Sequence, residues 1–129
     1  MVNTDVQVYC RNGRRLLPDN ESDIRMLLNE PQNLMRVMCS TDIASLTALF
    51  DAQGDTYISV TNDAAGTVSS LDNGSGIEEP VELMANTCPA EKMMCYDKAL
   101  AADIIMHFCK TGNLYPDCEW TIVSVDGNE

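Results

Sequence analysis

The residues best suited to nucleophilic or metal chemistry are one histidine and six cysteines. His107 is followed two positions later by Cys109. A histidine can activate a cysteine nucleophile, and both residue types bind zinc. However, side chains two positions apart on a helix point in different directions, and no C-x-x-C pair is present. We therefore expect a structural histidine and no metal site. The other five thiols, which we expect to be buried and free, are Cys10, Cys39, Cys88, Cys95 and Cys118.

Carboxylates are numerous enough for acid–base catalysis or calcium binding, but their pattern is that of turns. Asp51 and Asp55 flank one predicted turn, and Asp63 and Asp72 bracket a predicted strand. Paired acids can act as general acid and base, and oxygen ligands bind Ca²⁺. Aspartate is also a common turn residue, and the sequence has no EF-hand loop, P-loop, G-x-G-x-x-G or H-E-x-x-H run. The sequence therefore predicts no enzyme activity and no cofactor.

The distribution of charge favours a basic partner. The formal net charge is −12, and no lysine or arginine occurs between Val37 and Glu91. Nucleic-acid binding needs lysine and arginine for phosphate contacts, so this balance argues against it. An acidic surface would instead steer a basic protein toward it, although the same acidity would equally serve solubility. Five of the eight basic residues precede the acidic stretch: Arg11, Arg14, Arg15, Arg25 and Arg36.

Length and composition indicate one cytoplasmic domain. The 129 residues match the usual size of a single domain, and 45% apolar residues suffice for a core. No stretch approaches the roughly 20 apolar residues that span a bilayer. Met1 to Asp5 is polar and lacks the basic-then-apolar pattern of a signal peptide. We therefore expect a single domain over 1–129, in the cytoplasm and without membrane contact.

The first part of the chain alternates between strand and helix signals. Val6–Tyr9 predicts a first strand, which an Asn-Gly turn follows. A short helix is expected around 24–28, with Asp19, Asn20 or Ser22 as its N-cap and Pro31 beyond its end. Residues 34–39 stay ambiguous between helix and strand, because a short apolar run fits both periods.

The middle of the chain predicts an antiparallel meander. Its three strands are expected at 45–50, 56–60 and 67–71, because short glycine-containing turns separate these β-rich runs. A flexible loop is expected at 72–76, where Asp-Asn-Gly-Ser-Gly follows the third strand. Residues 78–84 are a candidate for a further edge strand.

The strongest predicted helix covers 97–110. Leu100, Ile104 and Phe108 recur every four residues and form one apolar face. Asp97 suits the N-cap, and Gly112 suits a left-handed C-cap. A final strand is expected over 118–125. Together the elements predict an α+β fold, with an antiparallel β-sheet of four to six strands and two main helices packed on one side.

Six residues at the end of this helix and beyond it form a recognisable signature. They are Phe108, Thr111, Gly112, Pro116, Glu119 and Trp120. This run resembles the closing signature of an immunity-protein family of bacterial polymorphic-toxin systems, often paired with deaminase-type toxins. In that family an alanine-rich helix ends in Phe-x-x-Thr-Gly, followed by proline and a tryptophan-led strand. Here an extra residue around 113–115 lengthens the turn before the proline. The resemblance implies that these residues are scaffold.

The resemblance also implies a function. An immunity protein binds one cognate toxin domain, here of deaminase or nuclease type, and occludes its active site or substrate groove in a 1:1 complex. From the acidic stretch we expect the toxin to bind the meander turns and the loop that follows. The expected toxin-binding residues are Asp51, Asp55, Asp63, Asp72, Glu78, Glu79 and Glu82. Two alternatives remain: a phage-type acidic inhibitor or nucleic-acid mimic of a nucleic-acid enzyme, and a small enzyme using a Cys–His pair or paired carboxylates.

Overall fold

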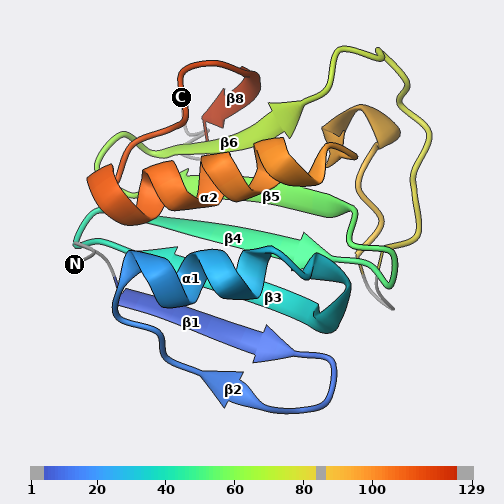
Figure 1. Ribbon diagram of the computed structural model, residues 1–129. Coiled ribbons are helices and arrows are strands. Elements are labelled where there is room, and N and C mark those ends of the chain that lie inside the picture. Colours follow the sequence, from blue (N-terminus) through green and yellow to red (C-terminus); the bar gives the residue numbers. More distant parts are fainter. Residues whose placement is uncertain (1–4, 84–86, 125–129) are drawn as a thin grey trace.

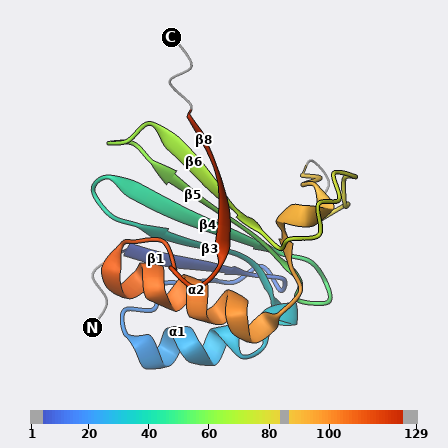
Figure 2. The same cartoon turned by 90° about the horizontal axis from the view of Figure 1, so that it is seen from above.

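One antiparallel sheet carries two α-helices on the same face in the computed structural model, which describes residues 5–83 and 87–124 (Figures 1 and 2). The strands are β1 (Asp5–Cys10), β2 (Arg15–Leu16), β3 (Leu34–Ser40), β4 (Ala44–Phe50), β5 (Thr56–Asn62), β6 (Thr67–Asp72), β7 (Met94–Cys95) and β8 (Glu119–Ser124). The helices are α1 (Glu21–Leu28) and α2 (Lys98–Thr111), with short 3₁₀ turns at Pro31–Asn33 and Glu91–Met93. The predicted α+β class, with both helices on one side, is therefore confirmed.

The predicted number of strands, four to six, is too small, because the sheet of the described residues has eight. Residues 34–39, which the sequence leaves ambiguous, form β3 between β1 and β4. The strands β2 and β7 have only two residues each, which is too short to produce a periodic pattern. Both exist because a neighbouring strand offers them backbone partners.

The strand order is β2-β1-β3-β4-β5-β6-β8, with β7 beside β5. The predicted meander is present as β4, β5 and β6, which follow one another both in sequence and in space. The outer edge of β5 is divided between two neighbours. β6 pairs with Ser59–Asn62, and β7 pairs with Thr56 and Tyr57. The chain from 73 to 93 leaves the end of β6 and returns to β5 at this division.

The core lies between the sheet and the helices. Burial alternates along β4, so that Leu46, Ala48 and Phe50 are buried while their neighbours are half-buried. From α2, Ile105 and Phe108 join the same cluster. Burying one large aliphatic or aromatic side chain stabilises the fold by roughly 1.5–3 kcal/mol. This layer therefore fixes the helices on the sheet.

The helix ends follow the sequence signals. The Asn20 side chain accepts a hydrogen bond from the backbone N–H of Asp23 and caps α1. The Asp97 side chain accepts from the N–H of Leu100 and caps α2. Gly112 ends α2 at φ 76°, in the left-handed region, and its N–H donates to the Phe108 carbonyl at 2.7 Å. The cap predictions for α2 are thus confirmed.

The opposite face of the sheet is not covered by either helix (Figure 2). The pairing registers place Tyr9, Arg36, Leu49 and Tyr57 side by side across four strands. The Arg36 guanidinium lies over the Tyr9 ring, 4.5 Å from its centroid. This cation–π contact shields one of the few positive charges of the chain.

The segment after β6 differs in part from the prediction. Residues 73–76 form an exposed loop, as expected, which hydrogen bonds connect to the returning chain; Asp72 is the last residue of β6. Residues 78–83 form no edge strand; an isolated bridge joins Pro80 to Ala90 instead. Proline lacks the N–H that a continuing strand ladder needs. Met84 and Val125, the ends of two predicted strands, lie outside the described residues. No helix of the described part is long and apolar enough to cross a membrane.

Candidate functional site

The antiparallel connections sort the predicted acidic residues between the two ends of the sheet. Asp51 and Asp55 lie in the β4–β5 turn, and Asp72 ends β6 at the same end (Figure 1). Asp63 lies in the β5–β6 turn and is therefore at the opposite end. We call the first group the acidic end. It consists of Asp51, Asp55, Asp72 and, from the loop that follows β6, Glu78, Glu79, Glu82 and Glu91.

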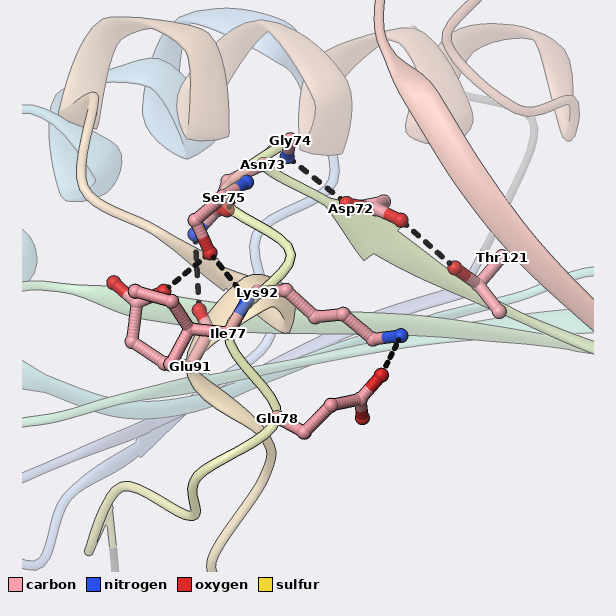
Figure 3. Close-up of polar contacts among 9 residues, drawn as sticks. All are labelled: Asp72, Asn73, Gly74, Ser75, Ile77, Glu78, Glu91, Lys92 and Thr121. Atoms are coloured by element: carbon pink, nitrogen blue, oxygen red, sulfur yellow. Dashed lines mark hydrogen bonds and ion pairs between the residues drawn. The ribbon is translucent and has the colours of Figure 1, made fainter.

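Asn73 fastens the loop of the acidic end to its returning arm (Figure 3). Its Nδ2 donates to the backbone carbonyls of Glu91 at 2.9 Å and Met94 at 2.8 Å. Its backbone N–H donates to the Lys92 carbonyl at 2.6 Å. Ser75 Oγ adds a 2.6 Å hydrogen bond to Glu91 Oε1. A hydrogen bond to a charged group contributes about 1.5–3 kcal/mol. The start of this loop and its returning arm therefore form one hydrogen-bonded frame.

Two of the predicted binding residues make contacts inside this frame (Figure 3). Asp72 accepts hydrogen bonds from the Gly74 N–H at 2.9 Å and from Thr121 Oγ1 at 3.2 Å. Glu78 Oε2 lies 2.7 Å from Lys92 Nζ. The hydrogen bond to Glu78 and its negative charge raise the pKa of Lys92, so the lysine stays charged. The side chains of Asp72 and Glu78 are thus already engaged in contacts that stabilise the loop.

The β4–β5 turn is held by Asp51. Its Oδ1 accepts from the backbone N–H groups of Gln53 and Asp55, each at 2.9 Å. Burial raises the pKa of Asp55; the negative charge of Asp51 adds to the rise, and Lys98 opposes it. Lys98 lies directly over this turn, because a Cβ on Gly54 would come within 2.9 Å of Lys98 Cε. One lysine therefore faces two carboxylates here.

Glu79 and Glu82 are the members of the acidic end that project freely. Both are exposed, and neither side chain forms a hydrogen bond or ion pair with the described residues. The backbone carbonyl of Glu79 nevertheless accepts from the Glu91 N–H at 2.8 Å, which fixes where its side chain starts. These two residues, with half-buried Asp55, are the acidic groups best placed to meet a partner.

Three of the arginines lie at the β2 edge of the sheet: Arg15 begins β2, and Arg11 and Arg14 lie in the β1–β2 turn. Arg25 lies on α1 and Arg36 on β3. Arg11 Nη2 donates to the Phe50 carbonyl at 2.6 Å, so one arginine is already engaged. Because Phe50 directly precedes Asp51, this hydrogen bond places Arg11 beside the β4–β5 turn, at the same end of the sheet as the acidic residues. Sequence reasoning missed a hollow of about 580 Å³ beside these arginines, lined by Arg11 and Arg14 together with Leu16, Met26, Leu27 and Glu30. No periodic signal marks it, because it forms only where the β1–β2 turn meets α1.

The histidine and the cysteine beside it point to different neighbours. Cys109 Sγ lies 2.8 Å from Cys39 Sγ in the core. The ring of His107 packs edge-on against Tyr115, with ring centroids 5.7 Å apart. The hydrogen bond to Cys109, and then burial, raise the pKa of the Cys39 thiol far above its usual range. The Cys39 thiol is therefore protonated at neutral pH, which does not suit a cysteine nucleophile.

All six cysteines are free thiols, as expected, but not all are buried. Cys39, Cys95 and Cys109 are buried, Cys10 and Cys118 are half-buried, and Cys88 is exposed. Burial raises the pKa of Cys118 to about 11. Over 5–83 and 87–124, no three His, Cys, Asp or Glu side chains gather as metal ligands would.

The signature residues around the end of α2 make structural contacts. The indole Nε1 of Trp120 donates to the Tyr115 carbonyl at 2.9 Å, which ties β8 to the turn before it. The Thr111 hydroxyl donates to the His107 carbonyl at 2.8 Å and closes the last turn of α2. Phe108 is 1% exposed and belongs to the core, whereas Pro116 and Glu119 are exposed.

Comparison with known proteins gives no relative. No family model, no curated protein and no solved structure matches this chain. The function must therefore be argued from the residues and their geometry.

Proposed function

We propose that this chain is an immunity protein that binds a cognate toxin domain of deaminase or nuclease type and occludes its active site or substrate groove. The observation that carries the proposal is the acidic end, where outward-facing carboxylates sit on a hydrogen-bonded loop. The backbone beside Glu79 and Glu82 is hydrogen-bonded to the returning arm, from the Glu91 N–H to the Glu79 carbonyl and from the Val81 N–H to the Pro89 carbonyl. Less ordering of the backbone is therefore needed when these two side chains meet a basic surface.

Charge complementarity explains why such a surface suits a toxin. Enzymes that act on nucleic acids present basic clefts, since they must bind phosphates. An acidic partner approaches such a cleft with an association rate constant of up to about 10⁸–10⁹ M⁻¹s⁻¹ at low salt, against about 10⁵–10⁶ without steering. Arg14 and Arg15, which are exposed at the β2 edge of the sheet, would be repelled by the same cleft and would therefore add orientation. Fast, oriented capture is what neutralising a toxin in the cytoplasm requires.

The resemblance supports the same function. Gly112 and Trp120, two of the signature residues, hold the end of α2 and the start of β8. Such residues would be shared by proteins that use one scaffold against different toxins. The binding surface would then differ from protein to protein, which fits its placement on the loop rather than on the signature.

The first experiment is a toxicity-rescue assay. The toxin domain encoded beside this gene is expressed in bacteria with this protein, with an unrelated acidic protein, or alone. Rescue by this protein only is the expected result. No rescue, or no toxin gene beside it, would contradict the proposal. Inhibition of several unrelated basic nucleic-acid enzymes would instead favour the phage-type inhibitor.

Charge reversal then tests the acidic end. The triple variant Asp55→Lys, Glu79→Lys and Glu82→Lys reverses three carboxylates that form no side-chain hydrogen bond with the described residues, so the contacts of Asp51, Asp72 and Glu78 are kept. We expect its affinity for the toxin domain to fall at least about tenfold at low salt and its salt dependence to flatten.

The matched control reverses three acids at the opposite end of the sheet: Asp5, Asp42 and Asp63. It changes the net charge by the same amount, so an equal loss of affinity in both triples would show that only total charge matters. Asp63, predicted as a binding residue, belongs to this control because the fold places it away from the others.

A further inference from the structure

The two edges of the sheet are protected to different degrees. β2 is two residues long, Arg14 and Arg15 lie at its start, and Pro18 follows soon after it. β8 at the other edge has six residues, Glu-Trp-Thr-Ile-Val-Ser, with no lysine, arginine or proline. Short length, basic side chains and proline are the devices by which proteins keep an edge from pairing with another chain. One edge carries them and the other does not.

The unprotected edge also exposes apolar side chains. Ile122 is 59% exposed and Val123 is 56% exposed, although both are branched aliphatic residues. Adjacent strand residues point to opposite faces, so β8 leaves an apolar side chain uncovered on each side of the sheet. Within the described residues β8 pairs with β6 alone, and its outer backbone edge has no strand beside it.

We propose that β8 is a docking edge on which an extended segment of the toxin partner pairs as one further strand. This inference rests on the proposed function and specifies how the partner is held. Main-chain hydrogen bonds to β8 would supply affinity, and side chains at alternate positions would supply selectivity. The partner segment would cover Ile122 and Val123 with its own apolar side chains.

The charges around β8 define the chemistry of that segment. Glu119 begins the strand beside Asp72 of β6, and Asp117 lies two residues before it. None of the three forms an ion pair with the described residues. The partner strand should therefore carry lysine or arginine at the end that meets Glu119 and apolar residues further along. A second copy of this chain fits poorly, because each copy carries a net charge of −12.

The test uses a lysine substitution on the edge and the same substitution elsewhere. Ile122→Lys places on β8 the charge that protects natural edges and leaves its backbone pairing with β6 possible. Ile43→Lys is the matched control: Ile43 is 53% exposed but lies in the β3–β4 turn, and the charge change is identical. We expect Ile122→Lys to weaken binding of the toxin domain at least about tenfold and Ile43→Lys to change it less than about twofold.

Amide hydrogen exchange on the wild-type chain gives an independent readout. Binding of the toxin domain should slow exchange at the outward-facing amides of 119–124. Unslowed exchange there, or equal affinity of both lysine variants, would overturn the inference while leaving rescue intact. Loss of rescue by the wild-type chain would defeat the proposed function itself. A wild-type dimer in sedimentation that Ile122→Lys dissociates would overturn the toxin as occupant and assign the edge to self-pairing.

Discussion

Gly112→Ala tests whether the signature at the end of α2 is a scaffold with a specific steric requirement. Gly112 has φ 76°, a conformation that an alanine adopts at a cost of about 1–2 kcal/mol. An added Cβ would also lie 3.1 Å from Thr41 Cγ2. Carbon atoms pack best at about 3.5–4.0 Å, so this contact is too close. The substitution therefore combines a backbone cost with a packing cost.

Gly13→Ala separates the two costs. Gly13 has a similar φ of 90°, and nothing lies within 4 Å of a Cβ built there. The backbone strain in Gly13→Ala should lower the free energy of unfolding by about 1 kcal/mol, partly offset because alanine restricts the unfolded chain more than glycine does. Gly112→Ala adds overpacking against Thr41, typically about 1–3 kcal/mol. We therefore expect a loss of roughly 2–4 kcal/mol for Gly112→Ala, at least double that for Gly13→Ala.

The assay is urea unfolding of the wild-type chain, Gly112→Ala and Gly13→Ala. The free energy of unfolding should depend on urea concentration with the same slope in all three. Thr41→Ser in the Gly112→Ala background removes Cγ2 but keeps the hydroxyl that accepts from the N–H groups of Ile43 and Ala44. It should restore about 1 kcal/mol or more if the contact with Thr41 is the cause. Equal losses for the two alanine variants, or no restoration by serine, would refute the reasoning.

Two further predictions concern titratable groups. Exposed Cys88 should react with iodoacetamide in the folded protein, whereas Cys39 should react only after unfolding, because the hydrogen bond to Cys109 and burial keep its thiol protonated. Mass spectrometry of timed samples measures both rates, and early alkylation of Cys39 would contradict the prediction. Asp55→Asn should stabilise the fold at pH 7 by a few tenths of a kcal/mol after solvent screening, because a folded pKa raised above 3.8 means that ionising Asp55 costs stability as the pH rises. The gain should disappear at pH 3, where Asp55 is protonated in both states, and a gain that persists there in urea titrations would rule out the electrostatic cause.

Part of the fold could be predicted because it depends on residues that lie close together in the sequence. The turns of the meander and the caps of α2 depend on residues a few positions apart, such as Asp97 with Leu100. β3 could not be assigned in this way, because its apolar residues fit a helix as well as a strand. Its partners decide the matter: Val37 pairs with Val8 on one side and with Ala48 on the other. Pairing between residues so far apart in the sequence leaves no periodic pattern within the strand itself.

The same limit applies to the predicted binding residues. The basic-free stretch identifies acidic groups but not what each carboxylate contacts. Asp72 is bound by Thr121, 49 positions away, and Glu78 by Lys92, 14 positions away. Asp63 is separated from the rest only because strands alternate in direction. The fold thus divides one apparent cluster into loop-building residues, outward-facing residues and one residue at the far end.

The acidic end and the β8 edge are neighbours, and this adjacency constrains both proposals. Asp72 ends β6 within the acidic end and pairs with Glu119, the first residue of β8. A partner strand on β8 would therefore bring its basic end beside the loop that carries Glu79 and Glu82. Electrostatic steering acts at long range and sets the approach, whereas main-chain pairing acts only at contact and sets how long the complex lasts. The two features would then serve successive stages of one encounter, with the loop guiding the partner to the edge that holds it.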